Sequence, residues 1–61
     1  MADRTKHPNG AAAVAAYVAA ISNDLAFMSR RNGLDTLGYL LDMVRLEAES
    51  QKQRAEVEHG T

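Results

Sequence analysis

The stretch Asn32-Gly33-Leu34-Asp35 decides the fold, because it joins the signals that end one helix to those that begin the next. Gly33 can adopt the left-handed backbone conformation that commonly ends a helix, and Leu34 stands where the Schellman motif places a hydrophobic residue. Asp35 can cap a new helix, since its carboxylate accepts hydrogen bonds from free backbone N–H groups. One long helix with a tolerated glycine is the alternative. The agreement of these signals favours the turn.

The patterns on either side of the turn predict an all-α fold, a two-helix antiparallel hairpin. A connection this short turns the second helix back along the first. We expect the first helix at about 11–31, the turn at 32–35 and the second helix at about 36–56. Residues 1–10 lack apolar periodicity and are expected to form a disordered arm, and residues 57–61 to form a frayed tail.

The first helix carries two apolar stripes of the same helical period. The large side chains are those of Val14, Val18, Ile21, Leu25 and Met28, and the small ones are those of Ala12, Ala15, Ala19, Ser22, Ala26 and Ser29. We expect the large stripe to pack inside the hairpin against Leu37, Leu41 and Val44. The small stripe either allows another backbone to approach closely or simply raises helix propensity.

The second helix is apolar around most of its circumference from Leu37 to Leu46, so one neighbouring helix cannot cover it. A chain of 61 residues buries only a small core, and without cysteine it has no disulfide to stabilise it, so we expect it to be only marginally stable as a monomer. We therefore expect a homodimer, with two hairpins forming a four-helix bundle. The expected dimer or partner interface consists of Tyr39, Leu40, Met43 and Leu46, with Ala12, Ala15, Ala19 and Ala26 beside them.

No motif for catalysis, for a cofactor or for a metal occurs in the sequence, so we expect a protein that is not an enzyme and holds neither. The net charge is −1, which argues against a general nucleic-acid binder with a basic face. Arg30, Arg31 and Arg45 are the local concentration of positive charge. They are a possible contact for an anion or a protein partner, or else ordinary helix-end charge.

The sequence gives few indications of where the protein resides. The absence of cysteine fits a reducing compartment, and no signal peptide is apparent. The apolar run 11–21 is interrupted by Ser22-Asn23-Asp24, and we interpret it as too short to cross a bilayer. The expected location is therefore the cytoplasm.

Residues 30–49, a third of the chain, resemble a stretch found in short, uncharacterised bacterial helical-hairpin proteins. The resemblance is carried by the run Arg31-Asn32-Gly33-Leu34-Asp35-Thr36-Leu37. It implies a small bacterial cytoplasmic protein and brings no known activity with it.

Three classes of function remain after these observations. The first is a non-enzymatic homodimeric protein–protein interaction or regulatory module, which the double apolar face of the second helix favours. The second is a small dimeric nucleic-acid-binding regulator, although no strand precedes the first helix and that helix has no basic face. The third is an amphipathic membrane-surface element, which the mixed charge of the polar faces disfavours.

Overall fold

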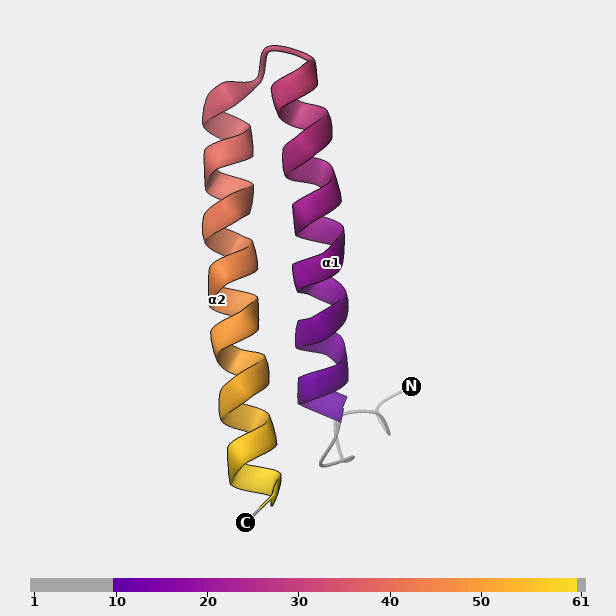
Figure 1. The fold of residues 1–61 in the computed structure, drawn as a ribbon, viewed down its shortest axis with the longest axis vertical. Coiled ribbons are helices and arrows are strands. Elements are labelled where there is room, and N and C mark those ends of the chain that lie inside the picture. The colour runs from indigo at the N-terminus through magenta and orange to yellow at the C-terminus, as the bar shows by residue number, and fades with distance from the viewer. Residues whose placement is uncertain (1–9, 61) are drawn as a thin grey trace.

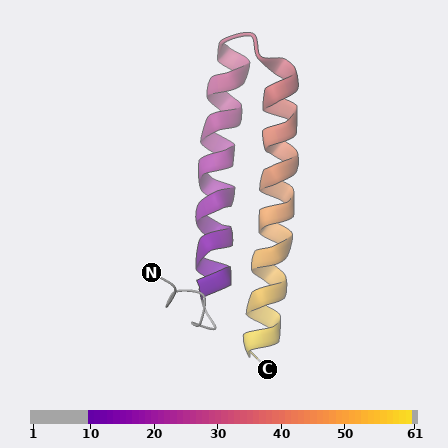
Figure 2. The same cartoon turned by 180° about the vertical axis from the view of Figure 1, so that it is seen from behind.

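A computed structural model describes residues 10–60, which form two antiparallel helices lying side by side (Figures 1 and 2). Helix α1 spans Gly10–Arg31 and helix α2 spans Asp35–Gly60. No strand occurs within these residues. The all-α hairpin expected from the sequence is confirmed, whereas the arm expected at 1–10 lies outside the described residues apart from Gly10.

Helix α2 continues to Gly60, past the end expected near residue 56, so residues 57–60 of the expected tail are helical in the structure and residue 61 lies outside the described residues. Side-chain pairs one turn apart support this polar half of the helix. Gln51 Nε2 donates to Glu47 Oε2 at 2.7 Å, and Lys52 Nζ lies 3.4 Å from Glu56 Oε2. Each such pair contributes a few tenths of a kcal/mol, which adds to the good helix propensity of these residue types.

The turn between the helices is a Schellman motif with Gly33 as its left-handed residue, at φ +78°. The Leu34 N–H donates to the Ser29 carbonyl at 2.8 Å, and the Gly33 N–H donates to the Arg30 carbonyl at 3.1 Å. These two hydrogen bonds satisfy carbonyl groups that would otherwise be free at the end of α1. Asn32 adds a third, because its Nδ2 donates to the Met28 carbonyl at 2.8 Å.

The start of α2 differs by one position from the expectation. The Gly38 N–H donates to the Leu34 carbonyl at 2.9 Å, so Leu34 takes the capping position and Asp35 becomes the first helical residue. Asp35 stabilises the helix from there through its negative charge in the first turn, which faces the positive end of the helix dipole.

Replacing Gly33 by alanine should lower the free energy of unfolding by about 1 kcal/mol, because a Cβ at positive φ is strained. The surrounding space is open, with nothing within 4 Å of the added Cβ, so the whole effect is conformational. Chemical denaturation followed by circular dichroism measures it, with Thr36→Ala as an exposed control near the same turn. A Gly33→Ala protein as stable as the parent would show that this turn is not the one formed in solution.

The residues that pack between the two helices are the small ones. In α1 the buried side chains are those of Ala15, Ala19, Ser22, Ala26 and Ser29, and in α2 Gly38 and Ala48 are buried. The expectation that the large stripe of α1 packs inside the hairpin is therefore wrong. Small side chains occupy the contact between α1 and α2 because they allow the two backbones to lie closer together than leucine and valine side chains would.

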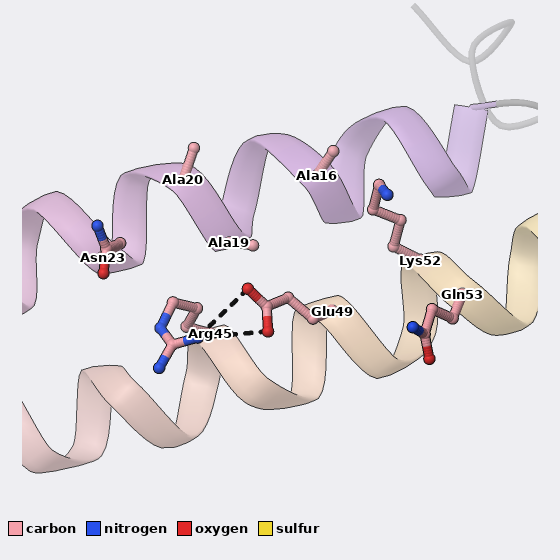
Figure 3. A pocket seen from close by; sticks show the side chains of 8 residues that line it. All are labelled: Ala16, Ala19, Ala20, Asn23, Arg45, Glu49, Lys52 and Gln53. Carbon is pink, nitrogen blue, oxygen red and sulfur yellow. Dashed lines mark hydrogen bonds and ion pairs between the residues drawn. The ribbon is translucent and has the colours of Figure 1, made fainter.

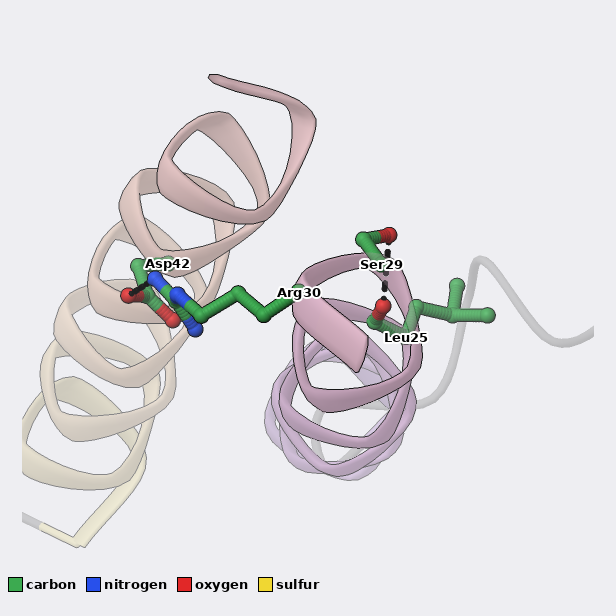
Figure 4. A network of polar contacts seen from close by, with 4 residues as sticks. All are labelled: Leu25, Ser29, Arg30 and Asp42. Atoms are coloured by element: carbon green, nitrogen blue, oxygen red, sulfur yellow. Dashed lines mark hydrogen bonds and ion pairs between the residues drawn. The ribbon is translucent and has the colours of Figure 1, made fainter. Parts of the chain in front are cut away.

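Gly38 shows how closely the helices approach near the turn. A Cβ added there would lie 2.9 Å from Arg30 Cγ and 3.3 Å from the Ala26 carbonyl oxygen. The buried Ser29 hydroxyl is satisfied within its own helix, since it donates to the Leu25 carbonyl at 2.7 Å (Figure 4). Arg30 then reaches across from α1 to form an ion pair with Asp42 on α2 (Figure 4). The helix contact is thus tight, and it contains little apolar side-chain area.

Candidate interaction surface

One face of the hairpin is a shallow apolar groove formed by both helices. Its lining comes from Ala11, Val14, Ala15 and Val18 of α1 and from Leu40, Met43, Val44, Glu47, Ala48 and Gln51 of α2. We call this surface the apolar groove. Glu47 is the one charged residue in this lining, at the end of the apolar part of α2.

The apolar surface extends along the hairpin beyond the groove itself. Ile21, Leu25 and Met28 continue the stripe of Val14 and Val18 at steps of three and four residues, so they share that side of α1. All five are exposed, Val14 at 53% and Leu25 at 41%. Among residues 10–57, Leu41 is the one large apolar side chain that is not exposed, and it is half-buried. The described hairpin therefore leaves nearly all its large apolar side chains in contact with solvent.

The structure separates the residues of the expected interface into three groups. Leu40 and Met43 line the apolar groove. Tyr39 and Leu46 are exposed on α2 but are not part of its lining. The small residues Ala15, Ala19 and Ala26 are buried between the helices, and Ala12 is half-buried, so they are largely occupied by the hairpin contact itself.

Sequence reasoning placed three groove residues on the wrong side. Val14, Val18 and Val44 were expected to face the other helix of the same hairpin, and the structure puts them on the open apolar groove. The signal in the sequence that pointed to the observed arrangement is Gly38. A glycine one turn into a helix, which lies opposite Ala26 and Arg30 in the structure, marks a close approach of backbones that the small stripe accommodates.

The opposite face of the hairpin is polar. A second shallow hollow there is lined by Ala16, Ala19, Ala20 and Asn23 of α1 and by Arg45, Glu49, Lys52 and Gln53 of α2 (Figure 3). Arg45 Nη1 donates to both carboxylate oxygens of Glu49 at 3.3 Å, as the dashed lines in Figure 3 show. Its charge is therefore neutralised within α2.

The three arginines singled out in the sequence do not form one cationic site. Arg30 is paired with Asp42, and Arg45 with Glu49. The Arg31 guanidinium lies over the Phe27 ring, 5.7 Å from its centroid. Arg45 lines the hollow on the polar face, whereas Arg30 lines a separate hollow with Asn23, Asp24, Phe27 and Met28. Each cation thus has a neighbour of its own, which is the pattern of helix-end and surface charge.

Two further properties of residues 10–60 bear on function. No group of three or more His, Asp or Glu side chains within this range is placed to hold a metal ion. Helix α1, at 22 residues and with a window of mean hydropathy 1.5, is long and apolar enough to cross a membrane. This differs from the sequence interpretation, which considered only the run 11–21. Core helices and signal sequences have the same length and composition, so this property alone assigns no location.

Comparison of the chain with protein-family models, with curated proteins and with solved structures found no match. The proposal for its function therefore rests on the surface described above.

Proposed function

We propose that this chain is a non-enzymatic interaction module that acts as a homodimer, in which two hairpins cover each other's apolar groove and form a four-helix bundle. The observation that carries the proposal is the contiguous apolar face shared by α1 and α2, with Leu40 and Met43 each 50% exposed. On a small protein an apolar patch of this kind is an association site. Two-fold symmetry allows the same patch to cover itself, which is the commonest solution among homo-oligomers.

The contact between α1 and α2 provides little hydrophobic stabilisation, which also favours association with a second copy. Its internal contact consists mostly of alanine, serine and glycine, and no large side chain is fully buried in it. Burial of a leucine, valine or methionine side chain contributes about 1.5–3 kcal/mol, whereas an alanine methyl contributes about 0.8 kcal/mol. Most of the available hydrophobic stabilisation of this sequence therefore lies on the open face. We expect folding and association to occur together, with no stable monomer.

This coupling is tested by thermal unfolding at several protein concentrations. If the hairpins fold only as a dimer, Tm should rise by several degrees between about 5 and 500 µM chain, because mass action favours the associated state. Circular dichroism at 222 nm is the readout. A cooperative transition whose Tm is the same across this range would contradict the proposal and identify a stable monomer.

A nucleic-acid regulator is the alternative from the sequence, and the paired state of the arginines argues against it. We expect no tight binding to duplex DNA or structured RNA at physiological salt, because Arg30 and Arg45 are each paired with a carboxylate and the net charge of the chain is −1. Fluorescence anisotropy of labelled probes measures the binding. Micromolar or tighter binding that weakens steeply with salt would overturn this expectation. Arg30, Arg31 and Arg45 are the residues to replace first in that case.

A further inference from the structure

We infer that the dipeptide Asn32-Gly33 in the turn is a site of spontaneous deamidation, and that the folded hairpin protects it from this reaction. The inference goes beyond the proposed function, because it concerns the turn of a single chain and requires no partner. Asparagine is a chemically labile residue. It is most reactive before glycine, since no side chain then shields the attacking backbone nitrogen. Both residues are exposed in the turn, so water reaches them.

The co-reactant of this modification is water. The Gly33 backbone nitrogen gives up its proton and attacks the side-chain carbon Cγ of Asn32. A C–N bond forms, the bond from Cγ to Nδ2 breaks, and the amide nitrogen leaves as ammonia with the proton from Gly33. The intermediate is a cyclic imide that joins the side chain to the backbone. Water opens this ring at either carbonyl, which gives aspartate at one and, at the other, isoaspartate, in which the main chain runs through the side-chain carboxyl carbon.

Hydrogen bonds keep the two reacting groups apart in the folded turn. The Gly33 N–H donates to the Arg30 carbonyl at 3.1 Å, so the attacking nitrogen is held on α1 with its proton in use. Asn32 Nδ2 donates to the Met28 carbonyl at 2.8 Å, which draws the side-chain amide back along the helix. Cyclisation requires rotation about the Asn32 Cα–C bond, and that rotation breaks the Gly33 hydrogen bond. The protection comes from these bonds and not from burial, because nothing lies within 4 Å of a Cβ added at Gly33.

Either product hinders the turn from forming again. Isoaspartate adds a backbone carbon between the Asn32 Cα and the Gly33 nitrogen, which shifts the hydrogen bonds of Gly33 and Leu34 out of register with α1. Aspartate keeps the chain length but replaces the Nδ2 donor by a carboxylate, which faces the Met28 carbonyl at the negative end of the α1 dipole. The covalent state of this turn therefore records how long the hairpin has been open, with these hydrogen bonds broken.

The rate of ammonia loss at Asn32 tests the protection. The full chain is incubated at mildly alkaline pH, in native buffer and in guanidinium chloride at the same pH and temperature, and peptide mapping by mass spectrometry follows the site. The folded chain should react at least about tenfold more slowly, because the reaction proceeds from the small fraction of turns that are open. Equal rates in the two solutions would overturn the inference.

Two variants make the same test without denaturant, and both leave the dipeptide unchanged. Ala26→Leu should raise the rate at Asn32 in native buffer severalfold, whether it loosens the hairpin or unfolds it, because Ala26 is buried between the helices. Ala20→Leu, at an exposed position of the same helix, should keep the parent rate. A rate that is the same in all three proteins would show that the hairpin does not protect the site, which would also overturn the inference.

The effect of the modification on the fold is measured on the reacted chains themselves. Ion exchange separates them from unreacted chains by their added negative charge, and circular dichroism in native buffer should show a lower helical signal for the reacted chains. Asn32→Gln is the matched control, since glutamine would have to form a larger ring and the variant keeps the other Asn-Gly pair, Asn9-Gly10. After the same incubation it should retain its own starting signal. Reacted parent chains that are as helical as unreacted ones would contradict the account of the turn.

Discussion

Leu40→Asp should dissociate the homodimer and unfold most of the chain at micromolar concentration. Leu40 lines the apolar groove, where the proposed partner would cover it. The substitution removes about 1.5–3 kcal/mol of apolar burial per copy and adds a carboxylate that loses its hydration in the interface. Because the residue occurs twice in a two-fold dimer, the combined loss is on the order of 5 kcal/mol, comparable to the whole stability of a small domain. Loss of the helical signal at 222 nm measures it.

Leu46→Asp is the matched control for this substitution. Leu46 lies on the same helix, is 57% exposed and does not line the groove. The control protein should remain folded and dimeric, with a change below about 1 kcal/mol, as for most surface positions. Equal behaviour of the two variants would mean that the apolar groove is not the interface. Greater damage from Leu46→Asp would move the interface to the side of α2 that carries Tyr39 and Leu46.

Ala26→Leu should destabilise the hairpin from within. Ala26 is 1% exposed, and its carbonyl oxygen lies 3.3 Å from the position a Cβ would take on Gly38. A leucine there has no space unless the helices separate, and overpacking of this kind typically costs about 1–3 kcal/mol. Thermal unfolding at a fixed protein concentration measures this loss of stability. Because separation of the helices also deforms the groove, the dimer should weaken in parallel.

Ala20→Leu serves as the control, since Ala20 is exposed on the same helix and the substitution adds the same volume without crossing to α2. Its stability should stay within about 0.5 kcal/mol of the parent. If Ala26→Leu were instead neutral or stabilising, the small stripe would not be the seam between the helices. The large stripe would then have to pack inside the hairpin, as the sequence pattern first suggested.

The turn could be predicted from the sequence because its chemistry is local. A glycine between the end of one apolar pattern and the start of the next specifies a left-handed residue, and the hydrogen bonds of Leu34 and Gly33 to α1 follow from that conformation. The cap of α2 was misplaced by one residue for an equally local reason. Asp35 is a strong capping residue by type, but the Schellman motif had already brought the Leu34 carbonyl into the capping position.

The sequence pattern could not show which of the two stripes of α1 packs against α2. Two stripes of equal period run along α1, and periodicity reports how many faces are apolar, not which face meets which partner. The large stripe seemed the better internal seam because it buries more area. That reasoning neglected Gly38, whose position opposite Ala26 and Arg30 permits a close approach. Once the small residues take the internal contact, the large ones are left for a second molecule, and the candidate interface shifts to Val14, Val18 and Val44 beside Leu40 and Met43.

The central claim is that a second copy of this chain covers the apolar groove, and the mass of the protein in solution tests it most directly. Light scattering coupled to size exclusion, at micromolar concentration and physiological salt, should give twice the 6.6 kDa of one chain. The Leu40→Asp variant should lose that mass, and Leu46→Asp should keep it. A well-folded protein of 6.6 kDa that remains monomeric on concentration would contradict the account.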